Sequence, residues 1–499
     1  MTNLLGYLEE TIKTHADKTA FAGENGSMTF GSIYEQARRI GSFLAEKEVR
    51  RKPVIVYMQK SPEAITAFLG VLYAGGYYVP VDKEMPEERR KNIFRMMPDA
   101  WCICEKDTKE TGHVLEYQRL CRAEEKPGLL TAIREQHVDT DPAYTVFTSG
   151  STGVPKGVVA NHRSVIDYIE QLSEILHISG DTVFGNQAPF YVDACLKEIY
   201  PTLKYGAKTV LIPRKKFRFP VELVNFLNEQ KINTICWVTP ALTMISALNT
   251  FEAVKPGYLR TIAFGSEVFQ TAQFRIWAEN VPAEYINLYG PTECTGMSAY
   301  YRVSREIRED EVIPIGRAFP NTGIFLLGEK ENGEYLISPE NEEEQGEIII
   351  RGTCVTMGYY ADQEKSSTVF VQNPLQKHYP EMVYRTGDIG RYQNGELVFV
   401  SRKDNQIKHM GHRIELGEIE TVTGRIENVF SCACIYSEKD RKIVLYYTGL
   451  LQPGELKKKL KEKLPSYMLP SGIYRLEELP LTLNGKTDRK RLKELYLSL

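Results

Sequence analysis

The segment Tyr144-Thr-Val-Phe-Thr-Ser-Gly-Ser-Thr-Gly-Val-Pro-Lys156-Gly157 joins a strand-like run to a loop rich in hydroxyl groups and glycine. Backbone N–H groups and hydroxyls in such a loop can surround an anion. The Walker phosphate loop does not fit, because Pro155 stands where its second glycine belongs and Gly157 where its metal-binding hydroxyl belongs. A polar loop without a ligand is the alternative for this segment taken alone. The segment therefore indicates nucleotide chemistry on a loop of another design.

Apolar strands alternate with helix-like segments on both sides of this loop. The strand-like runs include residues 53–57, 209–213 and 234–238, and residues 62–72 have helical periodicity. Such alternation is typical of an α/β fold with mainly parallel sheets. Between residues 322 and 400 the strands become shorter and are separated by Gly-Glu and Asn-Gly turns, which predicts a β-rich subdomain.

The composition is that of an ordinary globular chain. Its 499 residues are enough for two or more domains, and 42% of them are hydrophobic and 25% charged. The net charge of −3 provides no basic field that would recruit nucleic acid. The nine cysteines are scattered without Cys-x-x-Cys spacing, which favours reduced structural thiols. No run of about 18 apolar residues occurs. We therefore expect a cytoplasmic protein that neither inserts into a membrane nor binds nucleic acid.

Five further motifs follow the loop in order along the chain. They are Asn287-Leu-Tyr-Gly-Pro-Thr-Glu293, Tyr384-Arg-Thr-Gly-Asp388, Ser401-Arg-Lys-Asp-Asn-Gln406, Gly411-His-Arg-Ile-Glu-Leu-Gly-Glu418 and Asn484-Gly-Lys-Thr-Asp-Arg-Lys490. Together with the loop they resemble the adenylate-forming superfamily. The resemblance is closest to the amino-acid adenylation domains of nonribosomal peptide synthetases and to D-alanine:carrier-protein ligases. It covers nearly the whole chain.

The resemblance implies a large amino-terminal domain and a small, mobile carboxy-terminal lid. The large domain would span residues 1–401, with the β-rich subdomain at about 322–400. Residues 402–404 would form the hinge, with Asp404 as its pivot. Residues 405–499 would form the lid, and their own strand and helix pattern is enough for a small α+β domain. Rotation of the lid would let one protein build two active sites in turn.

The implied reaction begins with attack of a substrate carboxylate on the α-phosphorus of ATP, which gives an acyl-adenylate and pyrophosphate. Because two anions meet in this step, the site needs cations and oriented donors. Lys486 is the expected main cation, between the substrate carboxylate and the α-phosphate. Glu293 is the expected Mg²⁺ ligand. Thr292 would touch the α-phosphate, and Lys156 would meet the β- and γ-phosphates.

For the nucleotide, the resemblance implies an adenine site and a ribose site. Tyr289 would lie against the adenine face and Asn287 near its amino edge. Asp388 would accept both ribose hydroxyls, and Arg402 would help to hold the ribose or a phosphate. The full set expected around ATP is Thr148, Ser149, Gly150, Ser151, Thr152, Gly153, Gly265, Ser266, Glu267, Asn287, Leu288, Tyr289, Gly290, Thr292, Asp388 and Arg402.

Asp193 stands where amino-acid adenylation domains place the carboxylate that pairs with the substrate α-amino group. A helix N-cap is the alternative role for this residue. The expected pocket consists of Asp193, Ala194, Lys197, Trp237, Ala263, Gly265, Leu288, Gly296 and Met297. Lys197 is unusual there, because a buried lysine without a partner is costly. It suggests a substrate with an acidic or strongly polar side chain. Alternatively, Lys197 pairs with a protein carboxylate or extends away from the pocket.

No carrier-protein or condensation motif occurs in the chain, so the resemblance implies a separate carrier protein with a phosphopantetheine arm. The enzyme alternative is an acyl- or aryl-CoA synthetase, against which Asp193 argues. A nucleotide-binding scaffold without catalysis is the third alternative, and Lys486, Glu293 and Asp388 argue against it. Ser266 departs from the family, which usually has a glycine at this position.

Overall fold

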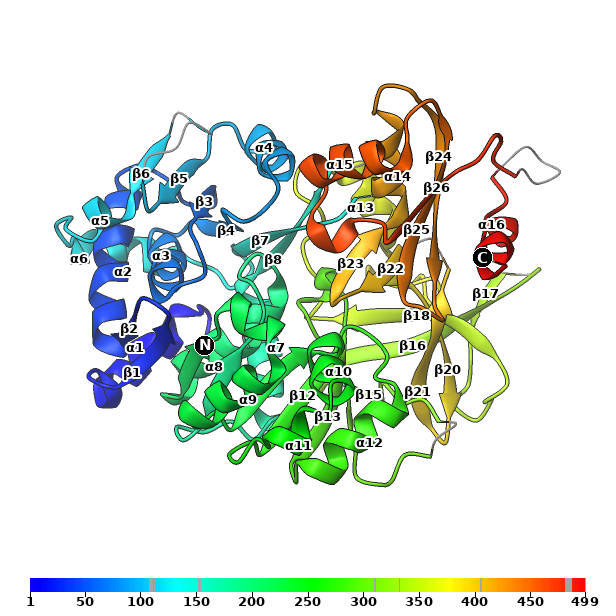
Figure 1. The fold of residues 1–499 in the computed structure, drawn as a ribbon. Helices are drawn as coiled ribbons and strands as arrows, with labels where there is room; N and C mark the ends of the chain where they lie inside the picture. Colours follow the sequence, from blue (N-terminus) through cyan, green and yellow to red (C-terminus); the bar gives the residue numbers. More distant parts are fainter. Residues whose placement is uncertain are drawn as a thin grey trace. The chain divides into compact units, whose positions relative to one another are not determined.

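The computed structural model divides into two compact units, which are described separately (Figure 1). It describes residues 1–106, 111, 113–150, 154–308, 311–331, 333–403, 406–480 and 487–498. The larger unit comprises Met1–Lys83, Asp99–Val146 and Gly157–Lys403. The smaller unit comprises Glu84–Pro98, Phe147–Lys156 and Asp404–Leu499. The predicted α/β fold, with a large amino-terminal and a small carboxy-terminal domain, is confirmed.

A nine-stranded sheet forms the centre of the larger unit, in the order β15-β14-β13-β12-β11-β9-β10-β1-β2. Neighbouring strands from β13 through β12, β11, β9 and β10 to β1 pair in parallel. At one edge β2 pairs antiparallel with β1, and at the other edge β14 and β15 pair antiparallel. The bounds are β1 Thr19–Gly23, β2 Gly26–Thr29, β9 Val183–Asn186, β10 Lys208–Leu211, β11 Thr234–Val238, β12 Thr261–Gly265, β13 Glu284–Tyr289, β14 Ala299–Arg302 and β15 Arg317–Ala318.

A second sheet has six strands in the order β6-β5-β3-β4-β7-β8. Its bounds are β3 Pro53–Tyr57, β4 Tyr77–Val81, β5 Trp101–Cys104, β6 Val114–Glu116, β7 Pro142–Thr148 and β8 Lys156–Asn161. The pairs β6–β5, β5–β3, β3–β4 and β4–β7 are all parallel. The segment quoted at the outset is the connection from β7 to β8.

Helices and short 3₁₀ turns connect the parallel strands of the larger unit, because parallel neighbours need a crossover connection. The helices are α1 Leu5–His15, α2 Phe30–Ala45, α3 Pro62–Tyr73, α5 Tyr117–Leu120, α6 Pro127–Glu135, α7 His162–Ile175, α8 Leu196–Tyr205, α9 Pro220–Glu229, α10 Thr239–Ala247, α11 Thr250–Ala253 and α12 Thr271–Asn280. The 3₁₀ turns include η1 Asp193–Cys195 and η3 Thr292–Cys294.

The nine-stranded sheet carries a different hydrophobic cluster on each face. Successive strand residues point to opposite faces, and on β11 Cys236 belongs to one cluster and Trp237 to the other. The cluster with Cys236 also contains residues of the six-stranded sheet, so it joins the two sheets. Which face a residue takes therefore decides which surroundings its side chain has.

The predicted β-rich region is an antiparallel sheet in the order β17-β16-β18-β20-β19, with β21 paired to β20. Its bounds are β16 Thr322–Lys330, β17 Gly333–Leu336, β18 Gln345–Gly352, β19 Phe370–Gln372, β20 Met382–Gln393 and β21 Glu396–Arg402, with α13 at Gln363–Val369. The hairpin from β20 to β21 turns at Asn394 and Gly395, which both have positive φ, as a tight hairpin requires.

The carboxy-terminal part of the smaller unit is built on the sheet β24-β25-β26 and the hairpin β22-β23. One hydrophobic cluster covers each face of the three-stranded sheet. The bounds are β22 Gln406–His409, β23 His412–Glu415, α14 Leu416–Gly424, β24 Val429–Ser437, β25 Lys442–Gly449, α15 Pro453–Lys463, β26 Gly472–Arg475 and α16 Arg489–Leu497. Helix α4, Glu87–Met96, also belongs to this unit.

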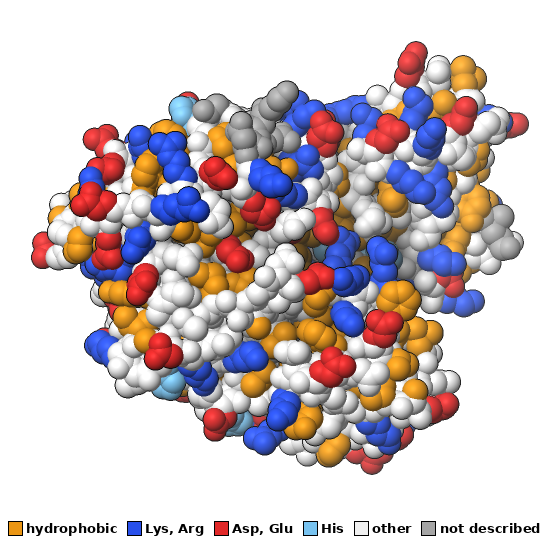
Figure 2. Space-filling view, turned by 60° about the vertical axis from the view of Figure 1, so that its left-hand side comes forward, with side chains coloured by type: hydrophobic (Ala, Val, Ile, Leu, Met, Phe, Trp, Pro, Cys, Tyr) orange, Lys and Arg blue, Asp and Glu red, His pale blue; other side chains and the backbone are white. Residues whose placement is uncertain are grey.

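Acidic and basic side chains are interspersed over the face seen in Figure 2. This mixture agrees with the small net charge of −3. Among the described residues, no helix combines the length and the apolar character needed to cross a membrane.

Candidate functional site

Three residues expected around the nucleotide meet at the carboxylate of Asp388. This residue lies opposite Arg402 in the β20–β21 pair, and Arg402 Nη1 is 2.6 Å from Asp388 Oδ1. The hydroxyl of Tyr289 donates to Asp388 Oδ2 at 2.6 Å. Burial and the charge of Asp388 raise the pKa of Tyr289, so this hydroxyl stays a donor. Each carboxylate oxygen thus receives a strong hydrogen bond within the buried sheet.

Hydrogen bonds between the Thr386 hydroxyl and the backbone fix the position of Asp388 in the strand. The hydroxyl of Thr386 donates to the carbonyl of Ile348 at 2.7 Å and accepts from the backbone N–H of Asp388 at 2.9 Å. Gly387 between them has φ 69°, in the left-handed region that glycine adopts without strain. The Thr-Gly-Asp order of this motif is therefore a local requirement of the fold as well as of the site.

Asn287 on β13 has its amide orientation set by the backbone. Its Nδ2 donates to the carbonyl of Pro314 at 2.8 Å. The amide oxygen is then the side of Asn287 that faces away from this bond, and it is an acceptor. An acceptor is what the amino edge of adenine requires.

The loop after β13 is too tightly folded for a side chain at Gly290. A Cβ atom there would lie 2.4 Å from the carbonyl oxygen of Gly296 and 2.5 Å from Met297 Cα. The loop leads into η3, where Glu293 is completely buried. The hydroxyl of Tyr359 donates to Glu293 Oε1 at 2.8 Å. Thr356 N–H donates to the backbone carbonyl of Glu293 at 3.0 Å.

Glu293 fits the role of a magnesium ligand that acts together with a nucleotide. Mg²⁺ is commonly held by one or two carboxylates plus phosphate oxygens and water. Among the described residues, no group of three or more His, Cys, Asp and Glu side chains could hold a metal by itself. A single buried carboxylate therefore matches an ion whose other ligands come with the substrate.

Asp193 and Lys197 lie close together at the start of α8. The turn η1, which contains Asp193, runs directly into this helix. Both residues are buried, with 9% and 5% of their surface exposed. Burial raises the pKa of Asp193 to about 6, although the Lys197 ammonium and the Thr292 hydroxyl act in the opposite direction. The side chain of Asp193 caps neither η1 nor α8, which removes the N-cap alternative.

Strands β11, β12 and β13 present one face of the nine-stranded sheet toward Lys197. Cys236, Ala263 and Ile286 are in register across β11, β12 and β13, so their side chains point the same way. The field of Lys197 acts on the Cys236 thiol, which identifies this face as the one near Lys197. Gly265 and Leu288 are two residues further along and share the face.

Trp237 does not belong to this face, which corrects the prediction that it lines the pocket. Its indole Nε1 donates to the carbonyl of Gly185 at 2.7 Å, and its ring packs edge-on against Phe217. It belongs to the hydrophobic cluster on the opposite side of the sheet. The β11 residue near Lys197 is Cys236.

The structure describes three other residues of the expected pocket, Ala194, Gly296 and Met297. Ala194 follows Asp193 in η1 and is partly exposed, and Met297 is 7% exposed. Gly296 has φ 94°, and a Cβ there would lie 3.5 Å from the ring of Tyr168. Tyr168 on α7 is buried, and the charge of Asp193 acts on its hydroxyl. Sequence patterns contain no indication that α7 reaches this place.

The segment Gly265-Ser266-Glu267 is held by the hydroxyl of Thr239, which donates to the carbonyls of Gly265 and Glu267 at 3.1 and 2.9 Å. A Cβ at Gly265 would lie 2.3 Å from the Leu288 carbonyl oxygen. Ser266 has φ 75°, where glycine is favoured. The glycine that is usual at this position would avoid that strain.

Within the smaller unit, the described part of the β7–β8 connection is closely held. The hydroxyl of Ser149 donates to the carbonyl of Arg413 at 2.8 Å. Thr148 Oγ1 is buried, and Lys156 at the start of β8 is 7% exposed. Gly150 is buried as well. The predicted residues Ser151, Thr152, Gly153, Asp404 and Lys486 lie outside the described residues, so their roles stay predictions.

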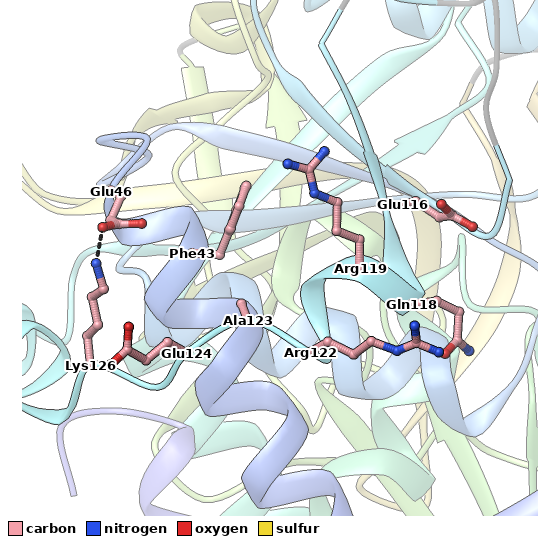
Figure 3. A pocket seen from close by; sticks show the side chains of 9 residues that line it. All are labelled: Phe43, Glu46, Glu116, Gln118, Arg119, Arg122, Ala123, Glu124 and Lys126. Atoms are coloured by element: carbon pink, nitrogen blue, oxygen red, sulfur yellow. Dashed lines mark hydrogen bonds and ion pairs between the residues drawn. The ribbon is translucent and has the colours of Figure 1, made fainter.

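A hollow elsewhere in the larger unit has no connection with these residues. Figure 3 shows its lining, which contains three acidic and three basic side chains and in which Lys126 pairs with Glu46. None of the residues expected at the site contributes to it.

Comparisons with known proteins cover both units. A family model described as AMP-binding enzyme matches residues 8–360, and one described as AMP-binding enzyme C-terminal domain matches residues 418–486. The D-alanine–D-alanyl carrier protein ligase of Listeria monocytogenes serotype 4b is 32% identical over 97% of this chain and 98% of its own length. Gramicidin S synthase 2 of Brevibacillus brevis is 29% identical over 97% of this chain, which spans only 11% of the length of that protein.

Solved structures have the same fold. A nonribosomal peptide synthetase protein containing adenylation and PCP domains has a TM-score of 0.83 and 25% identity, over 98% of this chain and 84% of that one. An adenylation domain of Vibrio cholerae, solved in complex with glycyl-adenosine-5'-phosphate, has a TM-score of 0.81 and 21% identity. The match with this second structure covers 100% of this chain and 98% of that one.

Proposed function

Since the chain belongs to the AMP-binding enzyme family, whose members are adenylate-forming ligases, we propose that it activates an amino acid with ATP and loads it onto a carrier protein. In the first step a carboxylate oxygen of the amino acid attacks the α-phosphorus, and the bond from this phosphorus to the pyrophosphate group breaks. In the second step a phosphopantetheine thiolate attacks the aminoacyl carbonyl, and the bond to AMP breaks. The products are an aminoacyl thioester, AMP and pyrophosphate.

The observation that supports this proposal most strongly is that Asp193 lies near Thr292 and Glu293, both of which act on the pKa of its carboxyl group. Asp193 is the carboxylate proposed to hold the α-ammonium. An amino acid bound there has its own carboxylate only a few bonds away, next to the residue proposed to touch the α-phosphate. Reactants held in such proximity react faster, because little translational and rotational freedom remains to be lost.

The nucleotide would use the Asp388 cluster and Asn287. Each ionised carboxylate has about four lone-pair sites, so Asp388 can accept ribose hydroxyls in addition to Tyr289 and Arg402. Arg402 Nη1 lies 2.6 Å from this buried carboxylate and fixes its orientation. The amide oxygen of Asn287 would accept from the adenine amino group.

Glu293 would hold Mg²⁺, and the bound ion supplies positive charge that stabilises the negative charge of the phosphates. Tyr359 orients the carboxylate of Glu293 through its hydrogen bond. Lys486 would stabilise the transition state of the first step, and Lys156 would hold the leaving pyrophosphate.

The test is amino-acid-dependent exchange of pyrophosphate into ATP, with all proteinogenic amino acids, several D-amino acids, and a few aryl and fatty acids. We expect exchange with one amino acid or a narrow group. Lys486→Ala should lower the rate by on the order of 100-fold or more, while the matched control Lys490→Ala, on an exposed residue of α16, should not. Exchange with non-amino acids alone would refute the amino-acid assignment.

The second step is tested with a phosphopantetheinylated carrier protein and with CoA as competing acceptors. We expect thioester formation on the carrier protein. Thioester formation on CoA alone would move the assignment to an acyl- or aryl-CoA synthetase, and the absence of any exchange would favour a non-catalytic role.

A further inference from the structure

A small cavity lies among helices α1, α2, α3 and α6 of the larger unit, which pack against one another. Its volume is about 150 Å³, and none of the residues expected to contact ATP or the amino acid lines it. Gly75 and His137 place it beside the starts of β4 and β7, which are parallel neighbours in the six-stranded sheet. Ligands of open parallel sheets generally bind at the carboxyl ends of the strands, so this cavity is at the opposite end.

Three side chains that line the cavity have buried polar atoms without a hydrogen bond to any residue that the structure describes. These atoms are the hydroxyl oxygen of Tyr73, Nη1 of Arg134 and both ring nitrogens of His137. Tyr73 is only 5% exposed. Buried polar groups in proteins are nearly always hydrogen-bonded, whether to protein, water or a ligand. Four such atoms around one cavity therefore indicate that a polar guest fills it.

These groups are mainly hydrogen-bond donors. Burial and the nearby Glu9 carboxylate raise the pKa of Tyr73, so its hydroxyl keeps its proton. Arg134 donates through Nη2 to Glu9 at 3.0 Å, and its Nη1 is a second, charged donor. Burial lowers the pKa of His137, so its neutral ring offers one donor and one acceptor.

The guest should therefore be richer in acceptors than in donors. Arg38 adds to the excess of donors, because it bonds to Glu125 through Nε and keeps its terminal nitrogens near the ring of Tyr73. An ionised carboxylate has acceptors only, and its two oxygens match the geometry of a guanidinium group. The carboxylates of Glu9 and Glu135 also line the cavity and oppose an anion of higher charge. A single negative charge fits best.

The rest of the wall and the size of the cavity limit the guest further. Leu72, Leu130 and Ile133 contribute apolar side chains to the lining, against which a short alkyl group can pack. The volume is several times what one water molecule needs. Thr131 and Glu135 are exposed residues of the lining, so they mark the side from which a ligand can enter.

We propose that this cavity is a binding site for a small monocarboxylate, such as acetate or propionate. The carboxylate accepts hydrogen bonds from Arg134 and Tyr73, and one ring nitrogen of His137 provides a third donor. The alkyl group packs against Leu72 and Ile133. This inference goes beyond the proposed function, because neither of its two steps uses these residues.

Propionate and propionamide are a matched pair of probes, because they have nearly the same shape and differ in charge. Saturation-transfer NMR on the full chain, with sodium chloride to keep the ionic strength constant, measures the binding of each. We expect saturable binding of propionate with a dissociation constant on the order of 1 mM, which so few non-hydrogen atoms can achieve. Propionamide should bind more weakly by on the order of 10-fold, since an ionised acceptor forms stronger hydrogen bonds.

Tyr73→Phe removes the buried hydroxyl and keeps the aromatic ring. Because this hydroxyl has no hydrogen bond to the described protein, thermal stability without propionate should not fall. The affinity for propionate should fall by on the order of 10-fold. Tyr34→Phe is the matched control, since Tyr34 packs edge-on against Tyr73 but does not line the cavity. Its affinity for propionate should equal that of the wild type.

Arg134→Gln is a second, independent variant. The pair of Arg134 with Glu9 is about one-third exposed on both sides, so its loss should have little effect on folding. Removal of the charged donor should weaken propionate binding by on the order of 10-fold or more.

Three results would overturn this inference. The absence of saturable propionate binding would mean that water fills the cavity. Equal affinities for propionate and propionamide would rule out a site for a carboxylate. An unchanged affinity in both Tyr73→Phe and Arg134→Gln would place the bound propionate elsewhere, for example where the substrate carboxylate binds. Each of these results would leave the proposed function intact.

Discussion

The carboxylates of Asp388 and Asp193 are both buried in the larger unit, yet they have opposite surroundings. Asp388 receives one hydrogen bond on each oxygen, from Arg402 and from Tyr289, both at 2.6 Å. Asp193 has Lys197 nearby but forms no ion pair within the described residues, and burial raises its pKa to about 6. The first carboxylate is fully supported by the protein, whereas the second depends on a ligand for its counter-ion.

This difference matches what each region is proposed to bind. ATP is the same in every turnover, so its ribose site can be assembled in advance from protein groups. The amino acid brings its own positive charge, so the protein leaves Asp193 without a cation at ion-pair distance. Pre-organisation lowers the cost of binding, and an unmet charge provides selectivity, because ligands that cannot meet it leave it buried and unpaired.

The strongest test of the comparison is Asp193→Ala. Removing the carboxylate leaves the α-ammonium of the substrate without a counter-ion in a buried site. We expect kcat/KM for the amino acid to fall by roughly 100- to 1000-fold, while the affinity for ATP changes little. Exchange kinetics with each substrate varied in turn measure both values. A comparable loss of ATP affinity would contradict the separation of the two sites.

Asp388→Ala should weaken ATP binding and also lower the stability of the fold. Arg402, whose side chain is 11% exposed, would lose the carboxylate that balances its charge and keep its hydrogen bond to the carbonyl of Thr386. Breaking such a pair from one side typically costs about 3–5 kcal/mol of stability. We expect a clear decrease in the free energy of unfolding and a KM for ATP raised by on the order of 10-fold or more. Denaturant unfolding and ATP-dependent exchange measure these effects, and an unchanged stability would mean that Arg402 finds another partner.

The pH dependence of stability tests the surroundings of Asp193. The pKa of Asp193 rises from its ordinary value of 3.8 to about 6 in the folded protein. The folded state therefore binds more protons than the unfolded state between these values, and stability falls as the pH rises through this window. The cost at neutral pH is roughly 3 kcal/mol. Asp193→Asn should thus equal the wild type in stability near pH 4 and exceed it above pH 6.

Substrate binding should have the opposite pH dependence, because only the ionised form of Asp193 pairs with an α-ammonium. We expect the KM for the amino acid to rise as the pH falls below about 6, with no matching rise in the KM for ATP. A KM for the amino acid that stays constant down to pH 5 would show that Asp193 is not its counter-ion. Two nearby charges also act on the pKa of Asp193: the Lys197 ammonium lowers it and the Glu293 carboxylate raises it.

The smallest effect is expected for Tyr289→Phe. This change removes one hydrogen bond to Asp388 but keeps the aromatic ring and the Arg402 pair. The loss is about 1 kcal/mol, so the KM for ATP should rise only several-fold. Kinetics at saturating amino acid measure it. A loss as large as that of Asp388→Ala would mean that the hydroxyl, rather than the ion pair, dominates the support of this carboxylate.

Much of the fold and part of the candidate site could be predicted from sequence patterns. The alternation of apolar strands and helices indicated the parallel sheets, and the turn pattern after residue 322 indicated the antiparallel sheet. The Thr-Gly-Asp motif was recognisable because Gly387 must adopt a positive φ and Thr386 bonds to the next residue but one. Such requirements are local, so they leave a mark in the order of neighbouring residues.

The prediction that Trp237 lines the amino-acid pocket failed for a reason that is not local. The strand pattern of residues 234–238 predicts that alternate residues face opposite ways, but it does not say which layer lies on which side. Packing against the six-stranded sheet puts Cys236 on one side, and packing against Phe217 puts Trp237 on the other. A shift of one residue along a strand therefore exchanges one environment for the other.

By itself, the sequence determined which chemical groups this protein possesses: the phosphate-loop residues, the acidic residues Asp193, Glu293 and Asp388, and the alternation that builds its sheets. Only the tertiary structure decided which groups meet. Tyr359 reaches Glu293 across 66 positions of the chain, and Tyr289 reaches Asp388 across 99. The physical reason is that local propensities act between near neighbours, whereas hydrogen bonds and charges in a folded core act between residues that packing alone brings together.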